Sequence, residues 1–210
     1  EALDKMKSQG MKGLIIDLRG NPGGLLDEAV NVSQKFLPRG QLIVSTEGRD
    51  PHENSVRRAE GKGDELKGEP IIILVNFGSA SAAEIVTGCM QDLHRAVILG
   101  EKTFGKGSVQ SIFPLDDGSA LKLTTAKYYT PSHRVIHEHG ITPDIFVPMT
   151  EEQEGALLVK SSIGGLESLD ETNRMRVAEI QDTQLASAQD LLQGIILYCE
   201  MTKSGKMAAR

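Results

Sequence analysis

Two short stretches of the sequence hold residues that could do chemistry. The first is NFGSASAAEI, residues 76–85, in which a turn of small residues leads from an apolar run into a helical pattern starting at Ser81. A serine at such a turn is exposed, and the next amide, Ala82, lies at the positive end of the helix, where it could hold an oxyanion. Ser81 and Glu84 also form S-x-x-E, a capping box that starts many helices without any catalytic role. Nucleophile and helix cap both remain open as interpretations of Ser81.

The second stretch is LGEKTFGKGSVQ, residues 99–110, which comes within one residue of a nucleotide-binding loop. It reads G-x-x-x-x-G-K from Gly100 to Lys106, but Gly107 stands where a hydroxyl should bind magnesium. A phosphate loop also needs a helix after it, whereas the residues after Lys106 alternate as in a strand. We therefore expect no nucleotide site. An exposed lysine in a glycine-rich turn is the simpler interpretation, since Gly105 and Gly107 let the backbone turn sharply.

A lysine can serve as the base for a serine nucleophile when its amine is neutral. None of the five histidines lies in a triad signature. Burial lowers a lysine pKa, so Lys106 would qualify if its loop carries it into the protein. Spacing alone does not place Lys106 near Ser81. His137 and His139 would share one face of a strand, but no third ligand is indicated, so we expect an exposed strand end and no metal.

The elements that must position these residues alternate between strand and helix. Short apolar runs at 13–18 and 70–76 are typical of buried strands, and each leads into a helical pattern, at 25–37 and 81–93. This alternation predicts an α/β layered domain. Further strands are predicted at 41–48 and 95–100, and a hairpin is predicted from 107–115 and 119–130. The polar residues 49–69 predict an exposed loop or hairpin.

The composition is that of a folded globular protein. Apolar residues make up 39% and charged residues 25% of 210 residues, enough for one sizeable domain with an appendage. The formal charge of −6 argues against a nucleic-acid partner, which needs a basic face. Cys89 and Cys199 form neither a metal spacing nor a disulfide framework, and no run is long enough to predict a membrane span.

The C-terminal part differs in character from the rest. We divide the chain into residues 1–150 and an acidic, loop-rich and helical segment, 151–210. A stripe at helical spacing predicts an amphipathic C-terminal helix packed on its own domain: Leu185, Ala188, Leu192, Ile195 and Cys199.

Several motifs in the same order give the chain a resemblance to a known family. From about residue 10 to 148 it resembles the carboxy-terminal processing peptidases, or tail-specific proteases, a serine/lysine family. The motifs are GLIIDLRGNPGGLLDEAV, IIILVNFGSASAAEIVTGCMQD, RAVILGEKTFGKGSVQSIFPLDDGSALKLTTAKYYTP and GITPDIFVP. The resemblance implies a crotonase/protease-like α/β core of spiralled β-β-α units with a C-terminal helical extension.

The resemblance also implies roles for individual residues. Ser81 would be the nucleophile, Lys106 its general base, and Gln110 the residue that orients the lysine. If 106–110 is a strand, Lys106 and Gln110 share a face. The oxyanion amides would be Ala82 and Gly24, and Gly24 suits the role because no Cβ blocks the substrate carbonyl.

The activity implied is that of a serine endopeptidase acting on polypeptides at or near their C-terminal tails, without a cofactor. Ser79 would be a supporting residue. The resemblance further implies a homo-oligomer through the C-terminal helix and a location outside the cytoplasm, in the bacterial periplasm or envelope. We expect a truncated core that lacks a PDZ domain, with an absent or long Ser81–Lys106 hydrogen bond and weak activity. The alternative is a non-catalytic ligand-binding or scaffold module on the same fold, which would not need Ser81, Lys106, Gln110 and NPGG together.

Overall fold

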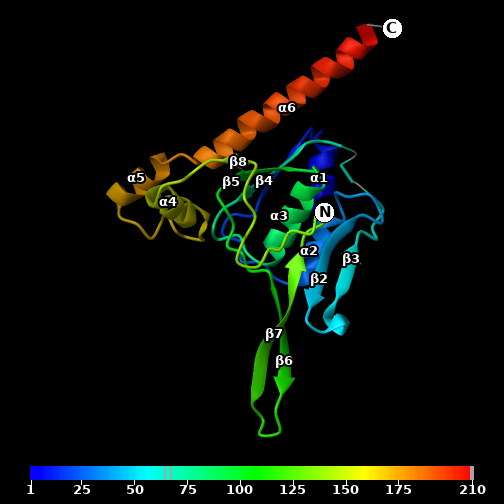
Figure 1. The fold of residues 1–210 in the computed structure, drawn as a ribbon. Coiled ribbons are helices and arrows are strands. Elements are labelled where there is room, and N and C mark those ends of the chain that lie inside the picture. Colours follow the sequence, from blue (N-terminus) through cyan, green and yellow to red (C-terminus); the bar gives the residue numbers. More distant parts are fainter. Residues whose placement is uncertain (64, 67, 209–210) are drawn as a thin grey trace.

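Helices and strands build two four-stranded sheets (Figure 1). The computed structural model describes residues 1–63, 65–66 and 68–208. Up to residue 100 the elements are α1 (Ala2–Ser8), β1 (Leu14–Asp17), α2 (Leu26–Ser33), β2 (Leu42–Gly48), the 3-10 helix η1 (Pro51–Glu53), β3 (Ser55–Arg58), β4 (Ile71–Val75), α3 (Ala82–Asp92) and β5 (Val97–Gly100). The remaining elements are β6 (Ser108–Pro114), β7 (Ala120–Tyr129), β8 (Ile145–Phe146), α4 (Glu151–Ser161), α5 (Glu171–Glu179) and α6 (Thr183–Ala208).

The first sheet is parallel and forms the centre of the molecule. Its strand order is β1-β4-β5-β8, and β4 is buried along its whole length. A strand covered on both faces needs apolar side chains on both sides, which accounts for the unbroken apolar run Ile71–Val75. Helices α2 and α3 cover one face of this sheet, and α6 packs on the other. The sheet therefore presents the carboxyl ends of β1 and β4 at one edge, where the loops with the candidate residues begin.

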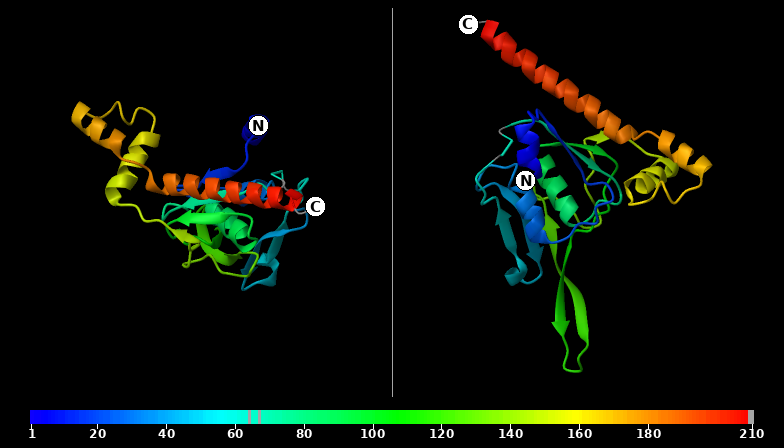
Figure 2. Two further views of the ribbon diagram at one scale, coloured as in Figure 1. Left: turned by 90° about the horizontal axis from the view of Figure 1, so that it is seen from above. Right: turned by 180° about the vertical axis from the view of Figure 1, so that it is seen from behind.

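The long helix α6 has two different halves. Near its start, Leu185, Ala188 and Leu192 pack against Ile72 and Leu74 of β4. Beyond these contacts the helix runs past the body of the protein (Figure 2). Among the side chains that the structure describes there, the large exposed apolar ones are Leu197, Tyr198 and Met201. Within the described part of the chain, no helix combines the length and the hydropathy that a membrane span requires.

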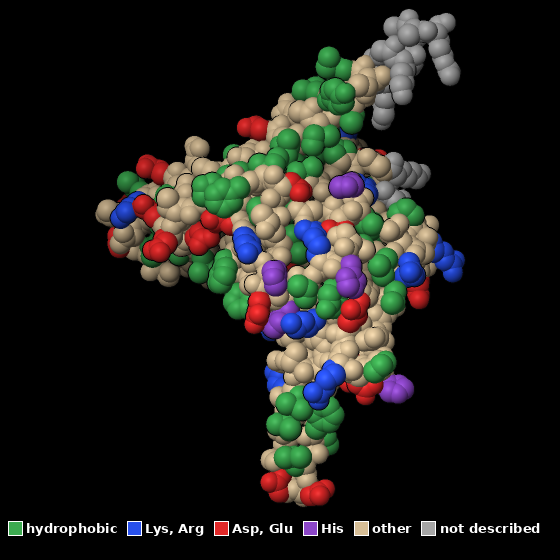
Figure 3. All heavy atoms as spheres, viewed as in Figure 1, with side chains coloured by type: hydrophobic (Ala, Val, Ile, Leu, Met, Phe, Trp, Pro, Cys, Tyr) green, Lys and Arg blue, Asp and Glu red, His purple; other side chains and the backbone are tan. Residues whose placement is uncertain are grey.

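The second sheet is antiparallel, with strand order β3-β2-β7-β6. The hairpin of β6 and β7 extends away from the body (Figure 1). Figure 3 shows hydrophobic side chains along this hairpin. Those exposed are Ile112, Phe113, Leu115, Leu121 and Leu123. The base of the hairpin joins the loop that contains Lys106, so this sheet positions that loop.

The predicted elements agree closely with the observed ones. The strands predicted at 13–18, 41–48, 70–76, 95–100, 107–115 and 119–130 are all present, with ends shifted by at most about two residues. The mixed α/β fold with a C-terminal helix is confirmed. The helix predicted over 25–37 ends at Ser33. The segment 49–69 contains η1 and β3, which pairs with β2, while residues 64 and 67 lie outside the described residues.

The prediction that residues 137–140 form a strand end is wrong. They form a turn, in which Glu138 has a φ of 62° and its amide donates to the Gly105 carbonyl at 2.8 Å. This contact folds the segment back onto the loop of Lys106, so it cannot extend. Nδ1 of His139 hydrogen bonds to the His137 carbonyl at 2.8 Å. Among the described residues, no group of three or more His, Cys, Asp and Glu side chains is arranged to hold a metal.

Candidate active site

Ser81 lies at a strained turn between β4 and α3. It is the N-cap residue of α3, is half-buried, and has φ 56° and ψ −117°. A positive φ is uncommon for a residue with a Cβ, and such strain clusters at functional sites. The prediction that a helix begins at Ser81 is confirmed, with Ala82 as the first helical residue. The first amides of a helix lack acceptors within the helix, so this turn presents backbone donors.

The carboxylate of Glu84 joins the Ser81 turn to the loop of Lys106. Glu84 is fully buried. Its Oε2 accepts hydrogen bonds from the amides of Ser81 at 2.9 Å and Lys106 at 2.8 Å. Its Oε1 accepts from the Thr103 hydroxyl at 2.5 Å and the Gly105 amide at 2.7 Å. The backbones of Ser81 and Lys106 therefore meet at one oxygen atom, although 24 other residues separate them along the chain.

Four donors explain how this carboxylate can be buried. Burial of a charge is unfavourable unless hydrogen bonds compensate it, and Glu84 also lies in the first turn of α3, at the positive end of the helix. The S-x-x-E pattern predicts only the contact with Ser81. The contacts with the loop of Lys106 were missed, because the pattern already has a local explanation that requires no distant partner.

Ser79 forms hydrogen bonds that join three loops, and it cannot serve as the nucleophile. It is fully buried, its hydroxyl donates to the Leu18 carbonyl at 2.7 Å, and the same oxygen accepts from the Asn76 amide at 3.1 Å. Its carbonyl accepts from the Phe104 amide at 3.0 Å. Ser79 thus ties the Ser81 turn to the loops that follow β1 and β5, which agrees with a supporting role.

The loop of residues 20–24 packs directly against the Ser81 turn. The Gly20 amide donates to Oδ1 of Asn76 at 2.9 Å, and the Ala80 amide donates to the Asn21 carbonyl at 2.9 Å. These two hydrogen bonds, one of them between backbone groups, hold the two loops side by side. This arrangement explains why short polar and glycine residues fill both loops.

The requirement for glycine lies at Gly23 rather than at Gly24. Gly23 has φ +91°, and a Cβ there would lie 2.6 Å from the Ala80 carbonyl oxygen and 2.7 Å from the Ala82 nitrogen. A Cβ at Gly24 would meet nothing within 4 Å. Gly24 is therefore open to an approaching molecule, as its expected role requires, while Gly23 makes a close contact with the backbone of the Ser81 turn.

The side chain of Lys106 is exposed, which agrees with an exposed lysine in a glycine-rich turn, and the loop does not carry this side chain into the protein. The glycines on either side of Lys106 are buried, as is Thr103 earlier in the loop. A Cβ at Gly107 would lie 2.3 Å from the His137 nitrogen, and one at Gly105 would lie 3.0 Å from the Gly140 nitrogen. The backbone of the loop packs inward at the two glycines, which leaves the lysine between them on the surface.

Gln110 does not share an uninterrupted strand with Lys106. Strand β6 begins at Ser108, and a bulge interrupts its pairing with β7 between Val109 and Gln110. A bulge shifts the alternation of side chains, so the expected common face from 106 to 110 does not follow. Both side chains are exposed.

The described residues show no hydrogen bond between the Ser81 hydroxyl and the Lys106 amine. The structure brings together the backbones of Ser81, Ala82, Gly23 and Lys106 through Glu84 and the loop contacts. Such an arrangement offers a hydroxyl nucleophile and backbone donors, which are two of the parts that acyl transfer requires.

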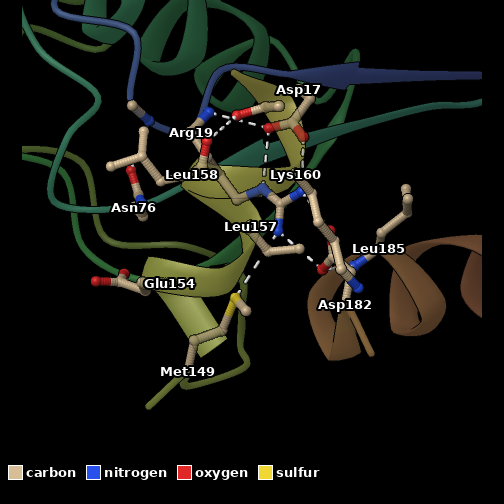
Figure 4. Close-up of a pocket in the computed structure, with 12 residues that line it drawn as sticks. Asp17, Arg19, Asn76, Met149, Glu154, Leu157, Leu158, Lys160, Asp182 and Leu185 are labelled. Carbon is tan, nitrogen blue, oxygen red and sulfur yellow. Dashed lines mark hydrogen bonds and ion pairs between the residues drawn. The ribbon is translucent and has the colours of Figure 1, made fainter. Parts of the chain in front are cut away.

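A cluster around Arg19 lies beside these loops and was missed in the sequence. The Arg19 guanidinium donates from Nη2 to Oδ2 of Asp17 at 2.6 Å. It also makes a bidentate pair with the Asp182 carboxylate, at 2.9 and 2.7 Å. These residues line a pocket of about 450 Å³ between the 18–20 loop and the C-terminal segment (Figure 4). The sequence gives no signal for a pair of residues that are 163 positions apart.

Arg19 and Asp182 shift each other's pKa in opposite directions. Burial by itself lowers the pKa of Arg19, but the Asp17 and Asp182 carboxylates outweigh it and raise that pKa. Burial raises the pKa of Asp182, but hydrogen bonds from Arg19 and the Leu185 amide outweigh it and hold that pKa below its usual value. Both groups therefore remain charged at neutral pH.

Comparison with known proteins identifies relatives of this chain by sequence and by structure. The family model described as peptidase family S41 matches residues 1–147. A carboxy-terminal-processing protease of Bartonella bacilliformis is 53% identical over 154 residues, covering 72% of this chain and 35% of that protein. A carboxyl-terminal-processing protease of Synechocystis sp. is 43% identical over 143 residues, covering 68% and 33%. The chain thus spans about a third of the length of these curated relatives.

A solved structure shows a similar fold. The photosystem II D1 C-terminal processing protease matches with a TM-score of 0.64 and 35% identity, over 78% of this chain and 42% of that one.

Proposed function

The chain belongs to peptidase family S41, and from this premise we propose that it carries the catalytic residues of a serine endopeptidase. The substrates we propose are polypeptides, cleaved at or near their C-terminal tails. The relatives are named as carboxy-terminal-processing proteases, which supports this reaction and this class of substrate. The family resemblance drawn from the sequence motifs is confirmed by the match over residues 1–147.

One observation carries the assignment of a Ser81–Lys106 dyad. The buried Glu84 carboxylate accepts hydrogen bonds from the amides of both residues. A helix cap alone needs only the contact with Ser81. The additional contact with Lys106 supports a common site, because it places the lysine loop beside the serine turn.

In the proposed reaction, the neutral amine of Lys106 accepts the proton of the Ser81 hydroxyl as Oγ attacks the substrate carbonyl carbon. The amides of Ala82 and Gly24 donate hydrogen bonds to the oxyanion that forms. The Lys106 ammonium then returns the proton to the leaving amine, and the peptide C–N bond breaks. Water attacks the resulting acyl-enzyme in the same way and releases the carboxylate product. The role of Gln110, to orient the lysine amine, rests on the family resemblance.

The exposure of Lys106 adds a condition to this mechanism. An exposed ammonium is stabilised by water, whereas a general base must be neutral when it accepts a proton. We propose that the bound polypeptide covers Lys106 and removes this water. Gly24 is also open to an approaching molecule, since a Cβ there would meet nothing within 4 Å.

The test compares wild-type full-length protein with Ser81→Ala on an unstructured polypeptide such as casein. The proposal requires cleavage by the wild type and its loss in Ser81→Ala. Ser108→Ala is the matched control, because Ser108 lies in the same region at the start of β6 and has no proposed role. Equal cleavage by all three proteins would remove the peptidase assignment and favour a non-catalytic ligand-binding or scaffold module.

We also propose that copies of the protein associate through the outer half of α6. The exposed side chains Leu197, Tyr198 and Met201 support this proposal, because they are large apolar groups close together on one helix. Light scattering should report an oligomer for the wild type and a smaller species for Tyr198→Glu. An unchanged mass in the variant would argue against the helix as the interface.

For the location we propose the bacterial periplasm or cell envelope, which rests on the family resemblance. Fusion of the full-length protein to a reporter that is active only outside the cytoplasm tests it. An inactive reporter in an otherwise stable fusion would contradict the proposal.

A further inference from the structure

Arg19 connects the 20–24 loop to the C-terminal segment. It lies directly before Gly20, and its side chain is only 11% exposed. Nη1 and Nη2 donate to the two carboxylate oxygens of Asp182 at 2.9 and 2.7 Å. Nε and Nη2 donate to the two carboxylate oxygens of Asp17 at 3.0 and 2.6 Å. A planar guanidinium in two bidentate pairs has a fixed direction, so Asp182 sets where the root of the loop lies.

Asp182 itself is held firmly. Its Oδ1 accepts a hydrogen bond from the Leu185 amide at 2.9 Å, which caps the start of α6. Gln184, which is fully buried, accepts from Nη1 of Arg19 at 3.2 Å and donates to the Val147 carbonyl at 2.8 Å. Helix α6 packs on the central sheet, so these contacts attach Arg19 to a rigid element (Figure 4).

The loop is thus held at two points. At its root, Arg19 pairs with Asp182, and further along Gly23 packs against the Ala80 carbonyl and the Ala82 amide. Gly24, the proposed second oxyanion donor, lies one residue beyond this contact. Asp182 lies outside residues 1–147, the part of the chain that the family model matches.

We infer that Asp182 is a positioning residue, which fixes the 20–24 loop against the Ser81 turn through its bidentate pair with Arg19. The catalytic consequence rests on the proposed function, because it requires Gly24 to donate to an oxyanion. Positioning of the loop is a property of the fold and can be measured independently of any activity.

The test is Asp182→Asn in the full-length protein. Asparagine caps helices as well as aspartate does, so the variant keeps α6 capped and removes the charge pair. Glu152→Gln is the matched control, since it removes the ion pair between Glu152 and Arg176 in the same C-terminal segment. Hydrogen exchange should be about tenfold faster at the amides of the 20–24 loop in Asp182→Asn, and unchanged in β4 and α6. The control should match the wild type.

Peptide hydrolysis gives the second measurement. A displaced donor affects the transition state more than the bound substrate, so kcat should fall by about ten- to one-hundredfold while KM changes little. Unchanged exchange in the loop, or faster exchange confined to α6, would overturn the inference. Faster loop exchange with an unchanged kcat in an active enzyme would overturn the catalytic consequence of this positioning. If the wild type hydrolyses no peptide, the proposed function fails, and the exchange comparison still decides whether Asp182 positions the loop.

Discussion

Replacement of Glu84 by glutamine is the most informative single change near the site. Glutamine has nearly the same shape as glutamate, but one of its two polar atoms is an NH₂ donor. In the wild type, all four partners of the Glu84 carboxylate donate to it. In either orientation of the glutamine side chain, its NH₂ group therefore faces at least one N–H donor that has lost its acceptor.

The structure allows the size of the effect to be worked out. With the NH₂ group at the position of Oε2, the amides of Ser81 and Lys106 lose their acceptor. With the NH₂ group at the position of Oε1, the Gly105 amide loses its acceptor, and the Thr103 hydroxyl must reorient. The second arrangement is less unfavourable. One buried donor without an acceptor destabilises by about 1–3 kcal/mol, and loss of the charge weakens each remaining hydrogen bond. We expect the free energy of unfolding to fall by about 3–5 kcal/mol.

Urea unfolding of Glu84→Gln and wild type measures this difference. Glu138→Gln is the control, because Glu138 lies in the turn that contacts the same loop and its side chain is 79% exposed. The control should be within about 0.5 kcal/mol of the wild type. A loss of less than about 1 kcal/mol in Glu84→Gln would refute the reasoning that one carboxylate holds the Ser81 turn and the Lys106 loop together.

Three further predictions follow from particular contacts. Gly23→Ala should lower the free energy of unfolding by about 1–3 kcal/mol, whereas Gly24→Ala should change it by less than about 0.5 kcal/mol; equal effects in urea unfolding would contradict this. Asp182→Asn should be less stable than the wild type at neutral pH. Because the folded protein holds the pKa of Asp182 low, this difference should persist above the usual aspartate pKa of about 3.9 and disappear as pH falls through the lowered value; a difference that grows in acid would contradict it. Burial raises the pKa of Cys89 to about 12, so iodoacetamide should label exposed Cys199 and leave Cys89 unlabelled in the native protein, as mass spectrometry can show.

The sequence predicts those parts of the fold that local patterns determine. The apolar run of β4 predicts a buried strand because both of its faces are covered, and S-x-x-E predicts the start of α3 at Ser81. Alternating polarity after Lys106 predicts β6 and excludes a phosphate loop. Each of these inferences depends on residues within a few positions of one another.

Contacts between distant residues could not be predicted in this way. Nothing in the sequence indicates that Asp182 pairs with Arg19, because both residue types are ordinary on a protein surface. The packing of Gly105 and Gly107 against the turn at 137–140 is also a tertiary contact. The bulge before Gln110 likewise depends on pairing with β7. Local periodicity contains no information on any of these three features.

The most direct test of the central claim is peptide hydrolysis by Lys106→Arg in the full-length protein, from about pH 6 to about pH 10. Arginine keeps the positive charge but does not lose its proton in this range, so it cannot act as a general base. Lys102→Arg is the matched control, because Lys102 is exposed in the same loop and has no proposed role. We predict that Lys106→Arg is as inactive as Lys106→Ala at every pH, while both remain folded and Lys102→Arg retains wild-type activity. Substantial hydrolysis by Lys106→Arg would contradict a serine–lysine mechanism for this chain.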